Sequence, residues 1–85
     1  MFFRKYIDVE TLIDSLGDIR PLTIIWDNGT RYKIDEIIRY EPLFHSHTGG
    51  HGEMFVVRIG KETRTMFLEQ INGGKHRWYI ESLKP

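Results

Sequence analysis

The residues best suited to chemistry lie in one glycine-rich segment, residues 43 to 52, which holds three of the four histidines. His45 and His47 are two residues apart, so their imidazoles would point to the same side of an extended chain. His51 follows a Gly-Gly pair that would let the chain fold back toward them. Because neutral imidazole is the commonest metal ligand near neutral pH, three such nitrogens would suit a divalent transition metal such as zinc, nickel or copper.

A solvated connection between two strands explains the same segment without a ligand, and we favour it. Ordering a loop costs about 1–2 kcal/mol per residue in backbone entropy. No carboxylate follows closely enough in the sequence to orient a metal-bound imidazole. The sequence therefore predicts no cofactor, and a metal held by His45, His47 and His51 is the alternative.

A second candidate site consists of basic residues that alternate with apolar ones. If the apolar side chains of the expected strands point inward, the intervening basic side chains point outward and form one basic face. Small β-barrels present arginine and aromatic groups in this way to single-stranded nucleic acid. The residues of this hypothetical face are Arg31, Lys33, Arg58, Arg64, Arg77 and Tyr79.

The overall charge argues against a nucleic-acid site. Twelve Lys and Arg balance twelve Asp and Glu, so the net charge is zero and gives no general attraction to a polyanion. Residues 1–42 hold six basic and eight acidic side chains (−2), and residues 43–85 hold six and four (+2), with every histidine in the second half. A solvated outer face of mixed charge is therefore the explanation we favour.

The sequence offers no arrangement typical of a catalytic site. It has no cysteine nucleophile, and Ser15, Ser46 and Ser82 lie in no context that activates a hydroxyl. The glycine-rich segment lacks the Lys followed by Ser or Thr of a phosphate-binding loop. We therefore expect no enzymatic activity.

Length and composition restrict the class of protein. Eighty-five residues, of which 40% are hydrophobic and 28% charged, predict one small globular domain over residues 1–85. The absence of cysteine excludes a disulfide framework and fits a reducing cytoplasm. The sequence has neither an apolar run of signal-peptide length at its start nor a stretch of about 18 apolar residues elsewhere. We expect a cytoplasmic protein without membrane contact.

Apolar and polar residues alternate along most of the chain, as in β-strands with one buried face. Two such runs flank Asn28 and Gly29, which is a strong signal for a hairpin because both residues tolerate the positive φ of a tight turn. The pattern recurs on either side of residues 60–62 and of residues 72–74. It predicts a mostly β fold: a single small antiparallel meander, curled into a barrel or sandwich of about five or six strands.

The N-terminal segment fits two structures. Apolar residues at helical spacing within residues 9–16, with Asp8 as an N-cap and Gly17 after the last turn, predict a short helix. Alternation over residues 7–13 predicts a strand equally well. The pattern alone does not separate them.

A resemblance over almost the whole chain favours the strand. The residues that carry it are Tyr6-Ile7-Asp8-Val9, Gly17 before Pro21-Leu22, Ile24-Ile25-Trp26, Asp27 with Gly29, Tyr32-Lys33-Ile34-Asp35, Ser46 with Gly49, Gly50 and Gly52, Val57-Arg58-Ile59, Glu62-Thr63, Phe67 with Glu69, and Arg77-Trp78-Tyr79-Ile80-Glu81. In this order they resemble a family of small bacterial proteins, mostly from Gram-positive species, which has no assigned activity. The resemblance implies a strand at residues 6–14. Phe44, His45 and His47 depart from the family's pattern, so a metal site there would not be a family property.

The expected outer face is more apolar than strands with one buried face need. The residues concerned are Ile25, Met54, Val56, Met66 and Leu68. Methionines suit an adaptable contact surface, so we expect a protein partner or self-association to cover them. The sequence thus predicts a non-enzymatic interaction module that binds a protein partner or nucleic acid, with a metal-binding protein using the histidine-rich loop 45–51 as the alternative.

Overall fold

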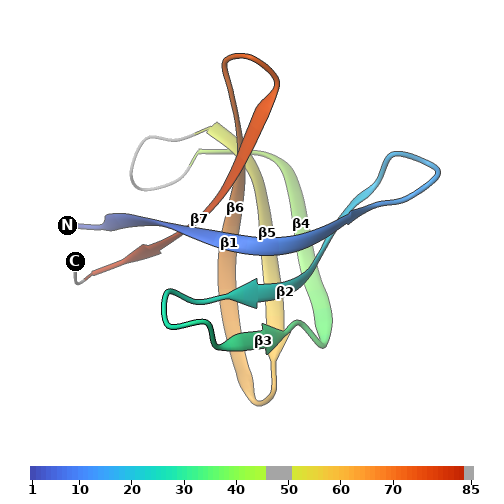
Figure 1. The fold of residues 1–85 in the computed structure, drawn as a ribbon. Coiled ribbons are helices and arrows are strands. Elements are labelled where there is room, and N and C mark those ends of the chain that lie inside the picture. Colours follow the sequence, from blue (N-terminus) through green and yellow to red (C-terminus); the bar gives the residue numbers. More distant parts are fainter. Residues whose placement is uncertain (46–50, 84–85) are drawn as a thin grey trace.

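A single antiparallel sheet of seven strands makes up the described part of the protein (Figure 1). The computed structural model describes the backbone of residues 1–45 and 51–83 and the side chains of residues 1–42 and 52–83. The strands are β1 (Phe3–Ile13), β2 (Ile19–Ile25), β3 (Arg31–Lys33), β4 (Glu36–His45), β5 (His51–Ile59), β6 (Glu62–Ile71) and β7 (Lys75–Ser82), in the spatial order β3-β2-β1-β7-β6-β5-β4. Among these residues there is no helix long and apolar enough to cross a membrane.

The predicted mostly β, antiparallel fold is confirmed, with seven strands in place of five or six. The predicted N-terminal strand is confirmed as well, and the alternative of a short helix is wrong. Asp14 explains this outcome, because its carboxylate accepts hydrogen bonds from the amides of Leu16 and Asp18 and so closes a turn between β1 and β2. Asp14, which would lie in the middle of the predicted helix, therefore follows the end of a strand instead.

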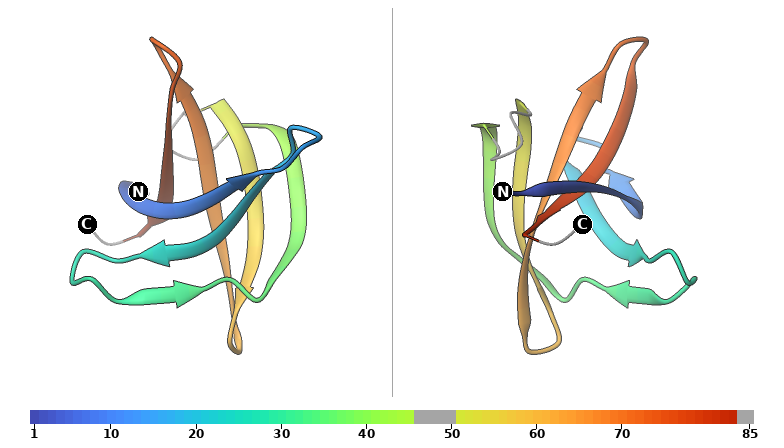
Figure 2. Two further views of the ribbon diagram at one scale, coloured as in Figure 1. Left: turned by 45° about the vertical axis from the view of Figure 1, so that its right-hand side comes forward. Right: turned by 90° about the vertical axis from the view of Figure 1, so that its left-hand side faces the viewer.

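The sheet bends along β1 and divides into two lobes. The first part of β1 pairs with β7 from Phe3 to Ile7, and the second part pairs with β2 from Asp8 to Ile13, with a bulge between Glu10 and Thr11. The large lobe contains β4 to β7 and the first part of β1, and the small lobe contains the rest of β1 with β2 and β3. Figure 2 shows the small lobe crossing in front of the large one, which gives a half-barrel.

The lobes also meet where β3 leads into β4. The amide of Ile34 donates to the carbonyl of Leu22 in the small lobe at 2.9 Å, and the next amide, of Asp35, donates to the carbonyl of Arg58 in the large lobe at 2.9 Å. The Asp35 carboxylate also accepts a hydrogen bond from the amide of Gly60 at 2.8 Å. This corner fixes one side of the half-barrel.

Apolar side chains from both lobes fill the space between them. The buried residues of this core are Ile7, Ile24, Ile34, Phe55, Val57, Met66, Leu68 and Trp78. Phe55 and Trp78 pack with their ring centroids 5.1 Å apart, and the Trp78 indole N–H donates to the Thr11 hydroxyl at 3.0 Å. The buried indole thus has the acceptor that it needs.

A second apolar cluster lies on the opposite, convex face of the large lobe. Met54, Phe67 and Tyr79 are buried there, with Phe67 and Tyr79 stacked at 5.1 Å. The sequence predicts Met66 and Leu68 on the outer face, which is wrong, because both are buried in the core between the lobes. Ile59 pairs with Glu62 across a tight turn, and residues directly opposite share a face, so every even-numbered residue of β6 up to Leu68 faces the core with Ile59.

Replacement of Gly52 by alanine should destabilise the fold. A Cβ atom at Gly52 would collide with the main-chain carbonyl of Leu68, which cannot move aside as the end of a flexible side chain can. We expect a loss of about 1–3 kcal/mol, the usual range for overpacking, measured as a lower urea midpoint. Thr65→Ala, at an exposed position of β6, should stay within about 0.5 kcal/mol of the wild type. Equal stability of the two variants would show that the main chain of β6 at Leu68 does not approach Gly52 closely enough to exclude a Cβ atom.

Candidate functional site

The histidines of the predicted metal site lie at the edge of the described structure. His45 and His51 are paired in the register of β4 and β5, but their side chains and the whole of His47 lie outside the described residues. In the part of the chain that is described, no group of three or more His, Cys, Asp or Glu side chains is arranged to hold a metal ion. The histidine site therefore stays a prediction.

The predicted basic residues do not form one face. Arg31 and Lys33 lie on β3 in the small lobe, Arg58 lies at the corner between the lobes, and Arg77 lies on the convex face of β7. Arg64, expected on the outside, instead points toward the space between the lobes, because it shares the face of Met66. The side chain of Tyr79, expected as a contact residue, is only 1% exposed and belongs to the convex apolar cluster.

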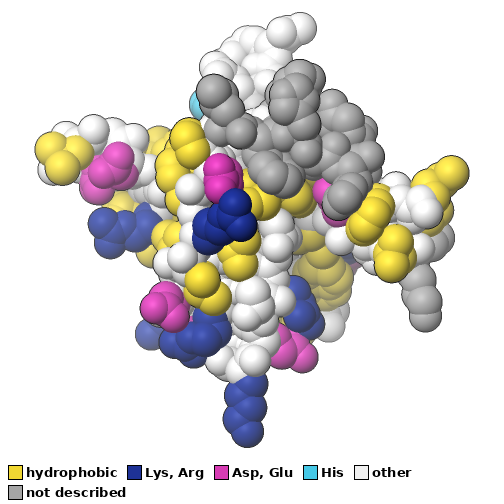
Figure 3. All heavy atoms as spheres, turned by 180° about the vertical axis from the view of Figure 1, so that it is seen from behind, with side chains coloured by type: hydrophobic (Ala, Val, Ile, Leu, Met, Phe, Trp, Pro, Cys, Tyr) yellow, Lys and Arg dark blue, Asp and Glu magenta, His cyan; other side chains and the backbone are white. Residues whose placement is uncertain are grey.

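Most of these cations have an acidic neighbour. The pairs are Arg31 with Glu10, Arg58 with Asp35 and Glu36, Arg64 with Glu62, and Arg77 with Glu69. Lys33 is the exception: within the described structure its ammonium group has no ion pair. Figure 3 shows the same intermingling on the back of the large lobe, where basic and acidic side chains lie near one another. The surface field of the arginines is therefore largely cancelled at short range.

The Arg77 pair belongs to a polar cluster that the sequence did not predict. Glu69, 8% exposed, accepts hydrogen bonds from Arg77 at 2.9 Å, from the Tyr6 hydroxyl at 2.8 Å and from Arg4 at 3.2 Å. The Arg4 guanidinium also lies 4.2 Å from the ring centroid of Tyr79 and covers it. Because this carboxylate is fully engaged within the protein, the cluster joins β1, β6 and β7 and offers little to a ligand.

A second ionisable pair lies on the core side of the large lobe. The Tyr40 hydroxyl donates a hydrogen bond to the Glu53 carboxylate, and this bond raises the pKa of Tyr40 to about 12. The hydroxyl thus stays protonated at neutral pH and is not available as a base. The Tyr40 ring packs on Phe55 with a centroid separation of 4.8 Å, so the pair helps to hold the edge strand β4 to β5.

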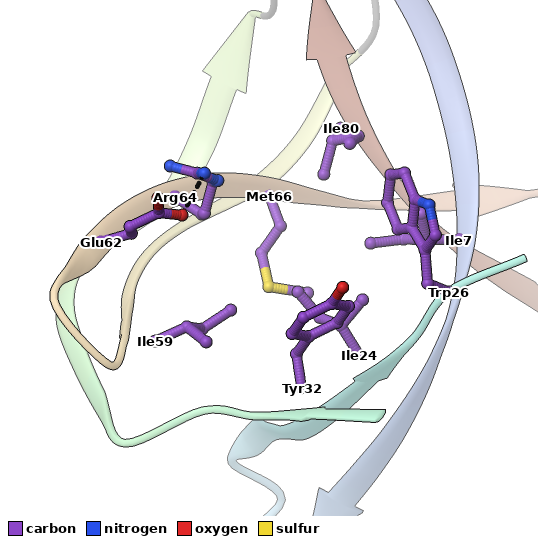
Figure 4. A pocket seen from close by; sticks show the side chains of 9 residues that line it. All are labelled: Ile7, Ile24, Trp26, Tyr32, Ile59, Glu62, Arg64, Met66 and Ile80. Atoms are coloured by element: carbon purple, nitrogen blue, oxygen red, sulfur yellow. Dashed lines mark hydrogen bonds and ion pairs between the residues drawn. The ribbon is translucent and has the colours of Figure 1, made fainter. Parts of the chain in front are cut away.

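The feature best suited to bind a ligand is an apolar cleft between the two lobes, about 270 Å³ in volume (Figure 4). We call it the lobe cleft. Both lobes contribute side chains that point into it, and apolar atoms dominate its surface. It is lined by Ile7, Ile24, Trp26, Tyr32, Ile59, Glu62, Arg64, Met66 and Ile80.

Among the described residues that line the lobe cleft, two are charged, Glu62 and Arg64. Arg64 forms an ion pair with Glu62, as the dashed line in Figure 4 marks, so the two groups neutralise each other. On the Trp26 side, the Lys5 ammonium lies 5.1 Å from the indole ring centroid and pairs with Asp27 at 2.5 Å. The chemistry of the cleft is that of a hydrophobic recess with a neutral polar rim.

The side chains of Tyr32, Ile59 and Ile80 line the lobe cleft, but the alternation of residues did not predict an opening among them. Tyr32 is 42% exposed although it lies on the core side of β3. The cleft arises because the small lobe, only three strands wide, does not cover the whole core side of the large lobe. Sequence alternation reports which way a side chain points and carries no information on the width of the facing layer.

The pairing of Arg31 with Glu10 predicts a measurable effect on the pKa of that carboxyl. The hydrogen bond from Arg31 lowers the pKa of Glu10 from its ordinary value of 4.5. In an NMR titration of side-chain carboxyl carbons, we expect Arg31→Gln to raise the midpoint of Glu10 toward 4.5. Since a lowered pKa stabilises the fold above the ordinary value, any contribution to stability would disappear as the pH falls through the folded pKa.

Lys33→Gln is the matched control, because it removes a cation from the same strand face without touching Glu10. Its Glu10 midpoint should equal that of the wild type. If both variants shift the midpoint equally, the effect comes from general charge and the Arg31 pair is not formed in solution.

Comparison with known proteins does not assign the cleft. No protein family, no curated protein and no solved structure matches the chain. The resemblance to small bacterial proteins stays a prediction, and the function has to be inferred from the geometry of the lobes.

Proposed function

We propose that the protein is a non-enzymatic interaction module that binds a protein partner through the lobe cleft. The observation that carries the proposal is an apolar recess open to solvent. Most of the charged side chains in the described residues are already in ion pairs and are less suited to bind a ligand. Sites for drug-sized ligands usually measure about 300–1,000 Å³. A cleft of about 270 Å³ is better suited to one or two apolar side chains presented by a larger molecule.

The neutral rim supports a protein partner over nucleic acid. Binding to nucleic acid depends mainly on cations that neutralise phosphates. Arg58, Arg64 and Arg77 each already have a carboxylate partner, and a phosphate would have to compete with it. An apolar side chain, by contrast, needs only to displace water from the cleft.

The energetics imply that the partner makes contacts beyond the cleft. Complete burial of one apolar side chain contributes about 1.5–3 kcal/mol. A dissociation constant of 1 mM already requires about 4 kcal/mol. A free amino-acid amide should therefore bind more weakly than millimolar, and a useful affinity needs additional interactions along the chain of the partner.

The test uses N-acetyl-L-phenylalaninamide as a probe, followed by NMR of the backbone amides. We expect concentration-dependent shifts at residues of the cleft, such as Ile24, Tyr32 and Ile59, and none with N-acetylglycinamide, which lacks a side chain. Ile59→Asp places a charge in the recess and should abolish the shifts. Tyr32→Ala, which removes an exposed wall, should weaken them.

Ile38→Asp is the control for Ile59→Asp, because Ile38 is 51% exposed on β4 and does not line the cleft. This variant should bind the probe like the wild type. The amide spectra show at the same time whether each variant is folded. Shifts that spread over the whole surface, or that persist in folded Ile59→Asp, would contradict the proposal.

A further inference from the structure

β3 is an edge strand that borders the lobe cleft, and among the described residues no further strand pairs with its outer edge. The amide of Trp26 donates to the carbonyl of Thr30, and the amide of Ile34 donates to the carbonyl of Leu22. In an antiparallel pair, hydrogen-bonded positions alternate, so Tyr32 also directs its backbone groups toward β2. It follows that Arg31 and Lys33 direct their N–H and C=O groups away from β2, to the open edge.

The side chains of the same strand divide between two faces. Tyr32 lines the lobe cleft, so Arg31 and Lys33 lie on the opposite face of the small lobe. Arg31 is paired with Glu10 across the sheet, whereas Lys33 has no ion pair in the described structure. A strand added to this edge would meet an apolar recess on one face and an unneutralised cation on the other.

The other open edge of the sheet is protected. β4 has irregularities in its pairing between Ile37 and Arg39 and between Glu41 and Phe44, and it contains Pro42. Bulges and proline are devices that prevent the addition of a further strand. The pairing of β3 with β2 is regular and contains no proline, so neither of these two devices obstructs the edge of β3.

We propose that the partner binds as an extended, antiparallel strand along β3, with apolar side chains entering the lobe cleft and acidic side chains alternating with them beside Lys33. The inference rests on the proposed function and specifies the chemistry of the partner. Backbone hydrogen bonds along the edge supply the affinity that one apolar side chain lacks, and the alternate side chains supply the selectivity.

The geometry also predicts which partner amides matter. Residues directly opposite one another in an antiparallel pair share a face. The acidic residues therefore lie opposite Arg31 and Lys33 and exchange backbone hydrogen bonds with them. The amides of the apolar residues point away from β3, into solvent.

The experiment uses a synthetic peptide, acetyl-Glu-Val-Glu-Phe-Glu-Val-Glu-amide, and measures its affinity by NMR titration. We expect binding that weakens at least tenfold when the glutamate amides are N-methylated, and that changes less than threefold when the valine and phenylalanine amides are N-methylated. The corresponding peptide with lysine in place of glutamate should bind at least tenfold more weakly than the glutamate peptide.

A charge reversal on the protein provides the second measurement. Lys33→Glu should lower the preference for the glutamate peptide over the lysine peptide at least tenfold. Lys75→Glu, at the distant β6–β7 turn, makes the same charge change and should leave the preference unaltered. Equal effects of the two variants would overturn the assignment of the acidic side chains to Lys33.

The outcomes separate this inference from the proposed function. If the peptide binds, loses affinity in Ile59→Asp and is insensitive to N-methylation, the cleft binds side chains and strand addition is overturned. If no peptide binds at 1 mM while the phenylalaninamide probe does, strand addition is again overturned and the cleft stands. If neither peptide nor probe binds, or if single-stranded oligothymidylate displaces the peptide, both proposals fall.

Discussion

The structure depends on a single constraint at the corner between β3 and β4, where two consecutive amides serve two different lobes. Ile34 bonds to Leu22 of the small lobe and Asp35 bonds to Arg58 of the large lobe, so the chain cannot shift toward one without losing its bond to the other. The bond from the Gly60 amide to the Asp35 carboxylate adds a side-chain anchor. The lobes are joined at two places, the bend of β1 and this corner. The corner holds Tyr32 of the small lobe at a fixed distance from Ile59 of the large lobe, and the lobe cleft lies between these two side chains.

Much of the fold could be predicted from local pattern. Asn28 and Gly29 placed the β2–β3 hairpin, and alternation identified the inward residues of β5 and β7, because both signals concern neighbours in the sequence. β6 was misjudged because its central residues are apolar on both faces, so alternation was silent and only the register of the turn after Ile59 could decide. The lobe cleft lay beyond prediction for a different reason: it is the part of the large lobe that the narrow small lobe does not cover, and no local pattern encodes that width.

The ion-pair partners of charged residues were harder to predict than the face of the sheet on which a side chain lies. The sequence shows that Arg31 and Arg77 are present, but their acidic partners are brought to them by strand register: Glu10 is 21 residues from Arg31, and Glu69 lies opposite Arg77 in the pairing of β6 with β7. Basic residues that alternate with apolar ones along a strand are therefore weak evidence for an anion-binding face until the register of the neighbouring strands is known. Lys33 retains its interest because its neighbours in the sheet include no carboxylate that pairs with it in the described structure.

The pairing of Phe3 with Ser82 brings the two ends of the described chain together at one edge of the β1–β7 ladder. Figure 1 shows the start of β1 and the end of β7 on the same side of the molecule. Every strand pairing is therefore compatible with a circularly permuted chain, in which a short linker joins these ends and new ends are cut in the turn at Gly17, where an added side chain would meet no neighbour. The same pairing leaves the entry and exit points of the described sheet a strand spacing apart, which is the arrangement of ends that tolerates such rearrangements of chain order.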